Sequence, residues 1–373
     1  MTRPLVSILI DTYNHEQFIE QAIRSVLDQD FPAAQFEIII VDDGSTDRTP
    51  DIVRQFEPRV RLIRKSNGGQ ASAFNAGIPE CQGEFIAFLD GDDWWTPDKL
   101  RRVTEFLAAE PAVGLVGHGI LESFGDGALR VIALHKQERF QLNSLASARI
   151  FRLLRCFLGT SRMSMRASIA RRLLPVPEAL VFEADEFLFT LAAALCDVAI
   201  LPYTLTHYRL HGANLYNAAG GNAAGLRRKQ LVIAALAEGL RRKLPALKVP
   251  ADAVACVVEI VQAEADQLRL ILDGGSPWET LRTENTIYAV LHGNAPRSHR
   301  LFRWVTVLPA LILPPRWYYA IRRWFAGQSW YGAMRARVLP VPAITLLSAQ
   351  EETKNHSDSS FQKCMQKKTN DSD

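Results

Sequence analysis

The sequence has few cysteines, and they lack the spacing of a metal site or a disulfide framework. Five occur in 373 residues, scattered from Cys81 to Cys364, with no C-x-x-C pair. The odd number and the wide spacing exclude a disulfide-stapled secreted domain and a zinc module as models for this chain. We therefore expect a reducing compartment.

Long apolar runs are also missing. The chain passes from Met1 directly into a strand-like run, without the apolar segment and cleavage site of a signal peptide. The apolar run at residues 304–313 is far shorter than the roughly 20 residues of a membrane-spanning helix, and Pro309 interrupts it. These absences predict a cytoplasmic protein.

The excess of positive charge is small. A formal net charge of +3 gives no reason to expect a nucleic-acid partner. The content of 48% hydrophobic and 22% charged residues is ordinary for a folded globular protein with a core of its own.

Short apolar runs alternate with helical patterns in the first third of the chain. The expected strands lie at residues 5–10, 36–41, 60–63 and 85–89, and the helices between them at 17–27, 46–56 and 71–78. Such alternation is typical of βαβ crossovers around a buried, mostly parallel sheet. The sequence thus predicts an α/β fold.

Beyond this region the patterns become more helical. Thr96 and Pro97 predict the start of a helix that runs to about Ala109. Further expected elements are an apolar run at 113–117, helices at 142–157 and 184–195, strand-like pieces at 198–201 and 205–210, and helices at 226–243, 251–272 and 278–291. The polar connector at 217–225 predicts a domain boundary, so we expect one domain over 1–216 and a helical extension over 217–300.

Acidic and polar residues follow three of the expected strands. They are Asp11 to Asn14, Asp42 to Ser45, and Asp90 to Asp93. Ligands of open α/β sheets bind at the carboxyl ends of the strands, so these residues are candidates for one site. Asp90 and Asp92 stand two positions apart, a spacing that lets both carboxylates bind one hard divalent cation together with a diphosphate. The alternative is a solvated turn.

Two other stretches have a functional and a structural interpretation. Asp42 to Asp47 either recognises a base or ribose or forms a turn in which Ser45 or Thr46 caps the next helix. The glycine-rich stretch that opens at Asn67 either lets the backbone approach a ligand or is a loop before a helix. Tyr13 either stacks on a nucleobase or packs in the core.

Five ordered strings together resemble the family 2 glycosyltransferases, which are inverting enzymes with the GT-A fold. The strings are VSILIDTYN, IIIVDDGSTDRT, NGGQASAFNAGI, GEFIAFLDGDDWWTPDKL and YRLHGAN, and the resemblance covers residues 4–215. It implies a Rossmann-like, mostly parallel sheet, a nucleotide-sugar donor, a divalent metal such as Mg²⁺ or Mn²⁺, and direct transfer of the sugar to an acceptor hydroxyl.

The resemblance also implies roles for single residues. Tyr13 and Asp43 would hold the base, with Asp11 beside them and Asn67 in the donor loop; Asp90 and Asp92 would hold the metal and the diphosphate. His211 would close over the diphosphate or metal.

The resemblance also implies a general base in an acidic pair at the start of a helix. Here Glu183, Asp185 and Glu186 stand in that region, with Asp185 the first choice, Glu186 the second and Glu183 the third. Phe74 stands where many members carry Arg, so the resemblance implies no phosphate contact there.

Tryptophan, tyrosine and arginine are interleaved in residues 301–347. Such a segment either lies on an anionic membrane surface, at the inner face of the cell membrane, or packs on the domain with snorkelling arginines. Residues 348–373 are polar and predict a disordered tail.

The predicted function is therefore transfer of a sugar from a nucleotide-diphosphate donor, a UDP-sugar by preference, to a glycan or lipid-linked acceptor in cell-surface polysaccharide synthesis. The alternative is a catalytically degenerate GT-A-fold protein that acts as a nucleotide-sugar-binding or membrane interaction module. Phosphatases with an aspartate nucleophile also carry Asp-x-Asp after a strand, but they require Thr or Val where this chain has Trp94.

Overall fold

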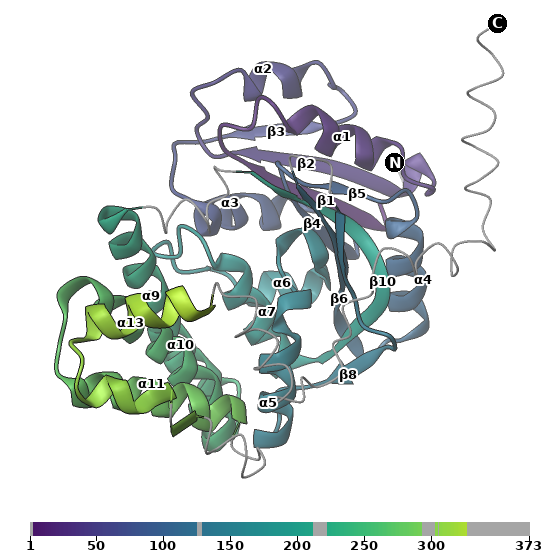
Figure 1. The fold of residues 1–373 in the computed structure, drawn as a ribbon. Coiled ribbons are helices and arrows are strands. Elements are labelled where there is room, and N and C mark those ends of the chain that lie inside the picture. Colours follow the sequence, from purple (N-terminus) through teal and green to yellow (C-terminus); the bar gives the residue numbers. More distant parts are fainter. Residues whose placement is uncertain (1–2, 125–128, 212–221, 293–302, 305, 327–373) are drawn as a thin grey trace, which may run out of the picture.

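A computed structural model describes residues 3–124, 129–211, 222–292, 303–304 and 306–326. Its centre is a ten-stranded sheet with the main order β3-β2-β1-β4-β9-β6-β10-β5 (Figure 1). Parts of the predicted connector at 217–225 and of the segment at 301–347, and the whole of the tail at 348–373, lie outside the described residues.

The first half of the sheet is parallel, as the alternating pattern predicted. It consists of β1 (Val6–Thr12), β2 (Phe36–Asp42), β3 (Arg61–Arg64) and β4 (Phe85–Asp90). The crossovers between them are α1 (Ile19–Leu27), α2 (Thr49–Arg54) and α3 (Gln70–Gly77). All four strands therefore end at the same edge of the sheet.

The second half of the sheet is mixed, which the sequence did not indicate. It contains β5 (Trp94–Trp95), β6 (Val113–Phe124), β7 (Leu129–Ile132), β8 (Glu138–Phe140), β9 (Ser164–Arg166) and β10 (Asp197–Leu210). Short β9 lies antiparallel between β4 and β6, while β10 runs parallel to β6. The two strand-like pieces expected at 198–201 and 205–210 are one bulged strand, β10.

Helices cover both faces of the sheet. Along β1, Ile8 and Ile10 pack with α1, α2 and α4 (Lys99–Ala109), whereas Leu9 packs with α3 on the other face. This alternation follows from the two-residue period of a strand. The second face is also covered by α5 (Leu145–Leu154), α6 (Ala167–Arg172) and α7 (Ala184–Leu195). The predicted α/β class is confirmed.

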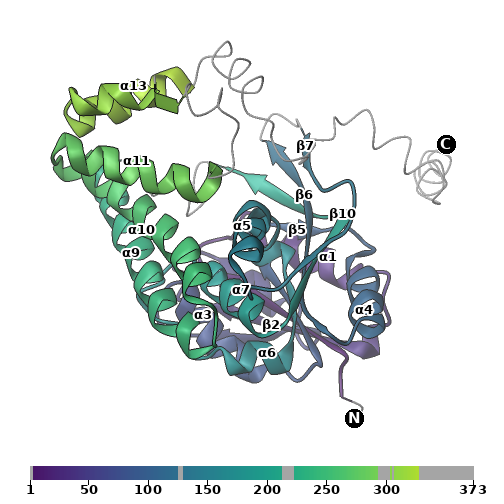
Figure 2. The same ribbon diagram turned by 90° about the horizontal axis from the view of Figure 1, so that it is seen from below.

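A C-terminal helical extension packs on this second layer. It comprises α9 (Ala223–Ala246), α10 (Ala251–Asp273), α11 (Pro277–His292), a 3-10 turn η5 (Leu308–Leu311) and α13 (Pro315–Ala326). Figures 1 and 2 show these helices beside α5 and α7, on the side of the molecule away from α1 and α2. Within the described part of the chain, no helix is both long and apolar enough to cross a membrane.

Two helix starts differ from the sequence prediction. Helix α4 begins at Lys99, and the Thr96 hydroxyl donates to the Asp98 carboxylate instead of capping the helix. Helix α2 begins at Thr49, so neither Ser45 nor Thr46 is its cap. Ser45 accepts a hydrogen bond from the Asn14 amide, which ties the loop after β2 to the loop after β1.

Phe74 provides a test of the core. Its ring is fully buried and meets Phe88 edge-on at a centroid distance of 5.5 Å. We expect Phe74→Ala to lower the free energy of unfolding by about 3–5 kcal/mol, because it leaves a cavity among packed side chains. Urea denaturation measures this, and Leu129→Ala, at an exposed site, should change it by less than about 0.5 kcal/mol. Equal losses in the two variants would contradict the packing described.

Candidate functional site

The ends of β1, β2 and β4 bring acidic residues together. In the sheet register Asp11 lies beside Asp90, and Thr12 lies beside Asp42. The loops that follow are joined by Asn14, whose side-chain oxygen accepts a hydrogen bond from the Thr46 amide at 2.8 Å. The three clusters identified in the sequence therefore share one edge of the sheet.

Asp11 and Asp90 are crowded by like charges. Burial raises the pKa of Asp11, and the charges of Asp92 and Asp185 raise it further. The pKa of Asp90 is also raised, mostly by burial and then by the charges of Asp11 and Asp92. The Oδ1 atom of Asp11 is buried with no hydrogen-bond partner. An unpaired carboxylate oxygen among other carboxylates is a place where a cation would be stabilised.

Asp92 is held by histidines. The Nε2 atom of His211 lies 3.0 Å from Oδ2 of Asp92, and Nε2 of His15 lies 3.9 Å from the same oxygen. Burial would raise the pKa of Asp92, but the hydrogen bond from His211 and the charge of His15 bring it below its usual value. Asp92 is therefore the carboxylate of this group that stays ionised most readily.

Asp93 is a buried neighbour of this group that bonds to the backbone of β10. Its Oδ1 atom accepts a hydrogen bond from the Arg209 amide at 2.9 Å, and the side chain is buried. Burial and the charge of Asp92 raise its pKa to about 8. The guanidinium of Arg209 donates to the Asp92 carbonyl and lies over the ring of Trp94. These contacts fix the turn after β4 against β10.

Asp43 anchors the glycine-rich loop. Its carboxylate accepts hydrogen bonds from Lys65 Nζ at 2.7 Å, from the Gly68 amide at 3.0 Å and from the Gly69 amide at 2.6 Å. Gly69 has φ +82°, and a Cβ atom there would meet Val181 at 2.5 Å, so only glycine fits. Asn67 lies exposed in the same loop.

A short turn bonds to both Asp90 and Asp185, the first-choice candidate base. This turn is η4 (Thr160–Arg162), which precedes β9. The Thr160 amide and hydroxyl donate to Oδ2 of Asp185 at 3.0 and 3.2 Å. The Ser161 hydroxyl donates to Oδ2 of Asp90 at 3.2 Å and accepts from the Asp90 amide. Adjacent residues thus hold Asp90 and Asp185, which are far apart in sequence.

Buried groups hold the η4 turn in place. The Ser161 carbonyl accepts hydrogen bonds from Lys99 Nζ at 2.7 Å, Trp95 Nε1 at 3.2 Å and the Thr206 hydroxyl at 2.6 Å. Lys99 is fully buried, with Nζ 3.8 Å from the Trp95 ring centre, and burial holds its pKa well below the usual value. These three donors come from β5, α4 and β10, so the turn is fixed from several sides.

The three candidate bases have different surroundings. Asp185, in the first turn of α7, is turned toward the site, as its bonds to Thr160 and its charge effect on Asp11 indicate. Glu186 is turned the other way and forms ion pairs with Arg152 and Arg155, which also pair with Glu264 of α10.

Glu183 precedes α7 in the left-handed region, with φ +61°. Burial raises its pKa to about 8, with further contributions from the charges of Glu186 and Asp185. It therefore lies beside the other two acidic residues, and the charge of Arg155 acts on its pKa in the opposite direction.

The aromatic candidates divide into exposed and packed rings. Tyr13 is exposed after β1, where a ring can meet a ligand. Trp94 stacks on His207 at 4.7 Å, and Trp95 is buried under Lys99. Phe74 lies in the core, so this position offers no phosphate contact.

Sequence reasoning did not select His15, Thr160, Ser161 or Arg209 as site residues. Arg209 stands two residues before His211 in the string YRLHGAN, so the sequence could have indicated it as a site residue. Thr160 and Ser161 lie in a stretch without a pattern, and only the folded chain brings them to the strand ends.

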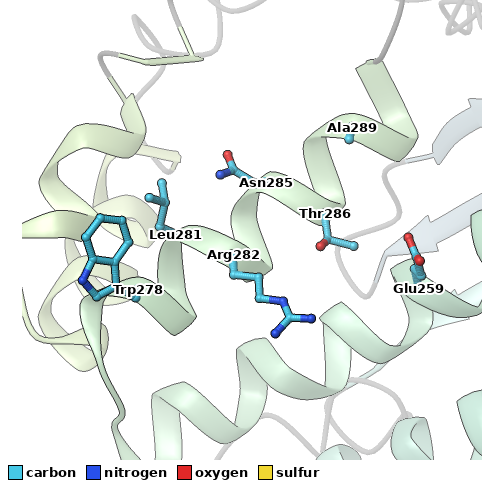
Figure 3. Close-up of a pocket in the computed structure, with 7 residues that line it drawn as sticks. All are labelled: Glu259, Trp278, Leu281, Arg282, Asn285, Thr286 and Ala289. Atoms are coloured by element: carbon cyan, nitrogen blue, oxygen red, sulfur yellow. The ribbon is translucent and has the colours of Figure 1, made fainter.

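A separate hollow lies in the helical extension, between α10 and α11. Figure 3 shows Trp278 at one end of it and Glu259 and Ala289 at the other, with Arg282 and Asn285 between them. It contains none of the residues predicted for chemistry. We therefore place the candidate active site at the strand ends.

The donor set at the strand ends suits a hard cation. Carboxylate oxygens are the ligands that Mg²⁺ and Mn²⁺ prefer, and Asp11, Asp90 and Asp92 supply several. Among the described residues, however, no group of three acidic, histidine or cysteine side chains forms a complete ligand set. A cation held here would need further oxygens from a bound diphosphate.

Part of the chain is similar to known proteins. Residues 7–173 match the family model described as Glycosyl transferase family 2. The chain is 34% identical over 216 residues to the uncharacterized glycosyltransferase alr2836 of Nostoc sp., covering 56% of this chain and 66% of that protein. It is 40% identical over 128 residues to TuaG of Bacillus subtilis, a putative teichuronic acid biosynthesis glycosyltransferase, covering 33% of this chain and 50% of TuaG.

A solved structure of Staphylococcus aureus TarS residues 1–349 with UDP-GlcNAc aligns with a TM-score of 0.49 and 20% identity, over 77% of this chain and 89% of that one. The curated relatives are matched over about half to two thirds of their own length. Residues 7–173 belong to the family 2 glycosyltransferases, as the five strings predicted, and the sheet has the mostly parallel arrangement with helices that was expected of the GT-A fold.

The raised pKa of Glu183 predicts a pH effect on stability. Because its pKa of about 8 in the folded state exceeds the usual 4.5, this group stabilises the fold at low pH and loses that contribution as the pH rises toward 8. Glu183→Gln removes the titration. Its free energy of unfolding should therefore fall less steeply than that of the wild type between about pH 5 and 8, by up to about 1.4 kcal/mol per pH unit.

Urea denaturation across this pH range measures the effect. Glu178→Gln, at an exposed carboxylate nearby in sequence, is the matched control and should follow the wild-type curve. Parallel curves for Glu183→Gln and the wild type would show that Glu183 does not titrate in this range.

Proposed function

We propose that the chain is an inverting glycosyltransferase that moves a sugar from a nucleoside diphosphate donor to a hydroxyl of a glycan or lipid-linked acceptor. The observation that carries the proposal is the η4 turn, which holds Asp185 and Asp90 through the adjacent residues Thr160 and Ser161. A base for the acceptor and a carboxylate for the leaving group are thereby supported by one rigid element. A UDP-sugar is the first donor to test.

Asp185 is the proposed general base. Its Oδ2 atom accepts two hydrogen bonds from Thr160, and Oδ1 accepts one from the Glu186 amide at 2.8 Å. Oδ1 therefore retains a lone pair that can take the proton of an acceptor hydroxyl. The hydroxyl oxygen then forms a bond to the anomeric carbon. The bond from that carbon to the diphosphate oxygen breaks on the opposite side, and its electron pair leaves with the phosphate.

Asp90 and Asp92 are the proposed ligands of a divalent cation, which when bound would neutralise charge on the departing diphosphate. His211 is the proposed residue that orients Asp92 and faces the diphosphate, and His15 supports it from the other side. Tyr13 is the proposed stacking partner of the base. Asp43 would act by shaping the loop of Asn67 and by direct contact with the base.

A role in cell-surface polysaccharide synthesis is proposed from the sequence relatives. TuaG is described as a putative teichuronic acid biosynthesis glycosyltransferase, although the match covers only half of its length. Acceptors of the same class, polymers of sugars or sugar acids, are therefore the first to test with this chain.

A panel of nucleotide sugars tests the reaction class. We expect the purified chain to release nucleoside diphosphate from one donor, with release dependent on Mg²⁺ or Mn²⁺ and lost with a chelator. Asp92→Asn should lower the rate at least about a hundredfold, because charge on the leaving group is then poorly stabilised. Full release in the presence of chelator would refute the proposed metal dependence. No release from any donor would refute the proposed transferase activity.

Three variants discriminate between the candidate bases. Asp185→Asn should lower kcat about 10²–10⁴-fold, because the acceptor proton has no receptor. Glu183→Gln and Glu186→Gln should keep kcat within about tenfold, although Glu186→Gln weakens a buried ion pair and so lowers stability. Initial rates and thermal unfolding measure the two effects. Undiminished transfer by Asp185→Asn would overturn the assignment.

The pH profile of the wild type gives a second test of the base. Burial raises the pKa of Asp185, and a base acts only in its ionised form. The acid limb of kcat should therefore lie above the pH at which an ordinary aspartate ionises.

A further inference from the structure

One side of α13 packs tightly on the helical extension. Tyr318 and Tyr319 are buried against Leu270 of α10 and Ala310 of η5. The guanidinium of Arg322 forms an ion pair with Glu284 of α11. Figure 2 shows α13 at the outer edge of the extension, away from the sheet. The orientation of the helix about its axis is thus fixed by its inner side.

The opposite side of α13 is also apolar, and it is exposed. Trp317, Ala320, Ile321 and Trp324 follow the i, i+3, i+4, i+7 spacing that places residues on one helix face, named here the α13 face. The exposed fractions of Trp317 and Trp324 are 66% and 61%, and Ile312, just before the helix, is 84% exposed. A helix that is apolar on two sides normally has both sides covered.

The sequence around α13 carries charge of one sign, although in the fold Glu284 pairs with Arg322 and Asp273 lies near Arg316. Residues 285–350 contain eight arginines and no aspartate or glutamate. Arg316 and Arg323 flank the tryptophans on α13 and are exposed. A second copy of this chain would bring its own arginines against these, which is unfavourable. An anionic surface is the complementary occupant.

The length of the helix fits a position on a membrane rather than across it. Its 12 residues span about 18 Å, well short of the hydrocarbon core of about 30 Å. Tryptophan and arginine side chains are stable at the boundary between headgroups and acyl chains, where a ring can enter the apolar layer while a guanidinium meets phosphate.

We propose that the α13 face binds the surface of a lipid bilayer that carries anionic headgroups, with Trp317, Ile321 and Trp324 inserted and Arg323 on the phosphates. This interaction is independent of the proposed transfer chemistry, so it can be tested without a donor or an acceptor. The proposal gives the helical extension a partner of its own, separate from the candidate active site at the strand ends.

Vesicle flotation of the full chain tests the proposal. Vesicles of phosphatidylcholine with about one third phosphatidylglycerol should carry the protein, whereas phosphatidylcholine alone should carry much less. The double variant Trp317→Ser/Trp324→Ser should bind at least about tenfold more weakly. Arg323→Gln should weaken binding to the anionic vesicles about fivefold and leave binding to phosphatidylcholine alone unchanged. Raising the salt concentration should weaken binding of the wild type.

Matched controls separate the α13 face from other exposed apolar groups. Tyr203→Ala, at an exposed aromatic on β10, should bind like the wild type. Thermal unfolding should be similar for all variants, because the changed side chains are exposed. Absence of binding by the full chain, or equal binding of the double tryptophan variant, would overturn the proposal. A dimer in light scattering that the tryptophan variant abolishes would assign the face to a second copy instead and would equally overturn it.

Discussion

Mutual repulsion of buried carboxylates is the constraint around which this molecule is organised. The register of β1 and β4 places Asp11 beside Asp90, and the turn that follows adds Asp92 and Asp93. Burial and like charge raise the pKa of several of these groups, which is a cost to the folded state. Such an arrangement is sustained only because hydrogen-bond donors and histidines surround it, and it favours a positively charged ligand.

The supporting groups come from the mixed half of the sheet. The Ser161 carbonyl is held by donors from three elements, including the buried amine of Lys99. The turn that is fixed in this way presents one residue to Asp90 and the preceding residue to Asp185. Strands β5 and β10, together with α4, therefore do more than extend the fold, because they fix the turn that holds the two proposed reactive centres.

The parallel half of the fold and its acidic strand ends could be predicted from sequence, because apolar runs of strand length alternate with helices there. The strand ends at Asp11, Asp42 and Asp90 followed directly. The short strands β5 and β9 could not be predicted, since two or three residues carry no periodicity and their pairing depends on distant partners. For the same reason Thr160 and Ser161 were missed. The helix caps at Thr96 and Ser45 were wrong because both side chains bond within loops instead.

The cluster of Arg152, Arg155, Glu186 and Glu264 has a geometric consequence. It ties α7, which carries Asp185, to α10, on which α13 packs. If α13 rests on a bilayer as proposed, the protein would set the height of the proposed reacting centre above the lipid, whatever the acceptor. A membrane-anchored acceptor would then need a minimum reach before its hydroxyl could meet Asp185, the proposed base. The molecule would thus measure the length of its substrate as well as recognise its chemistry.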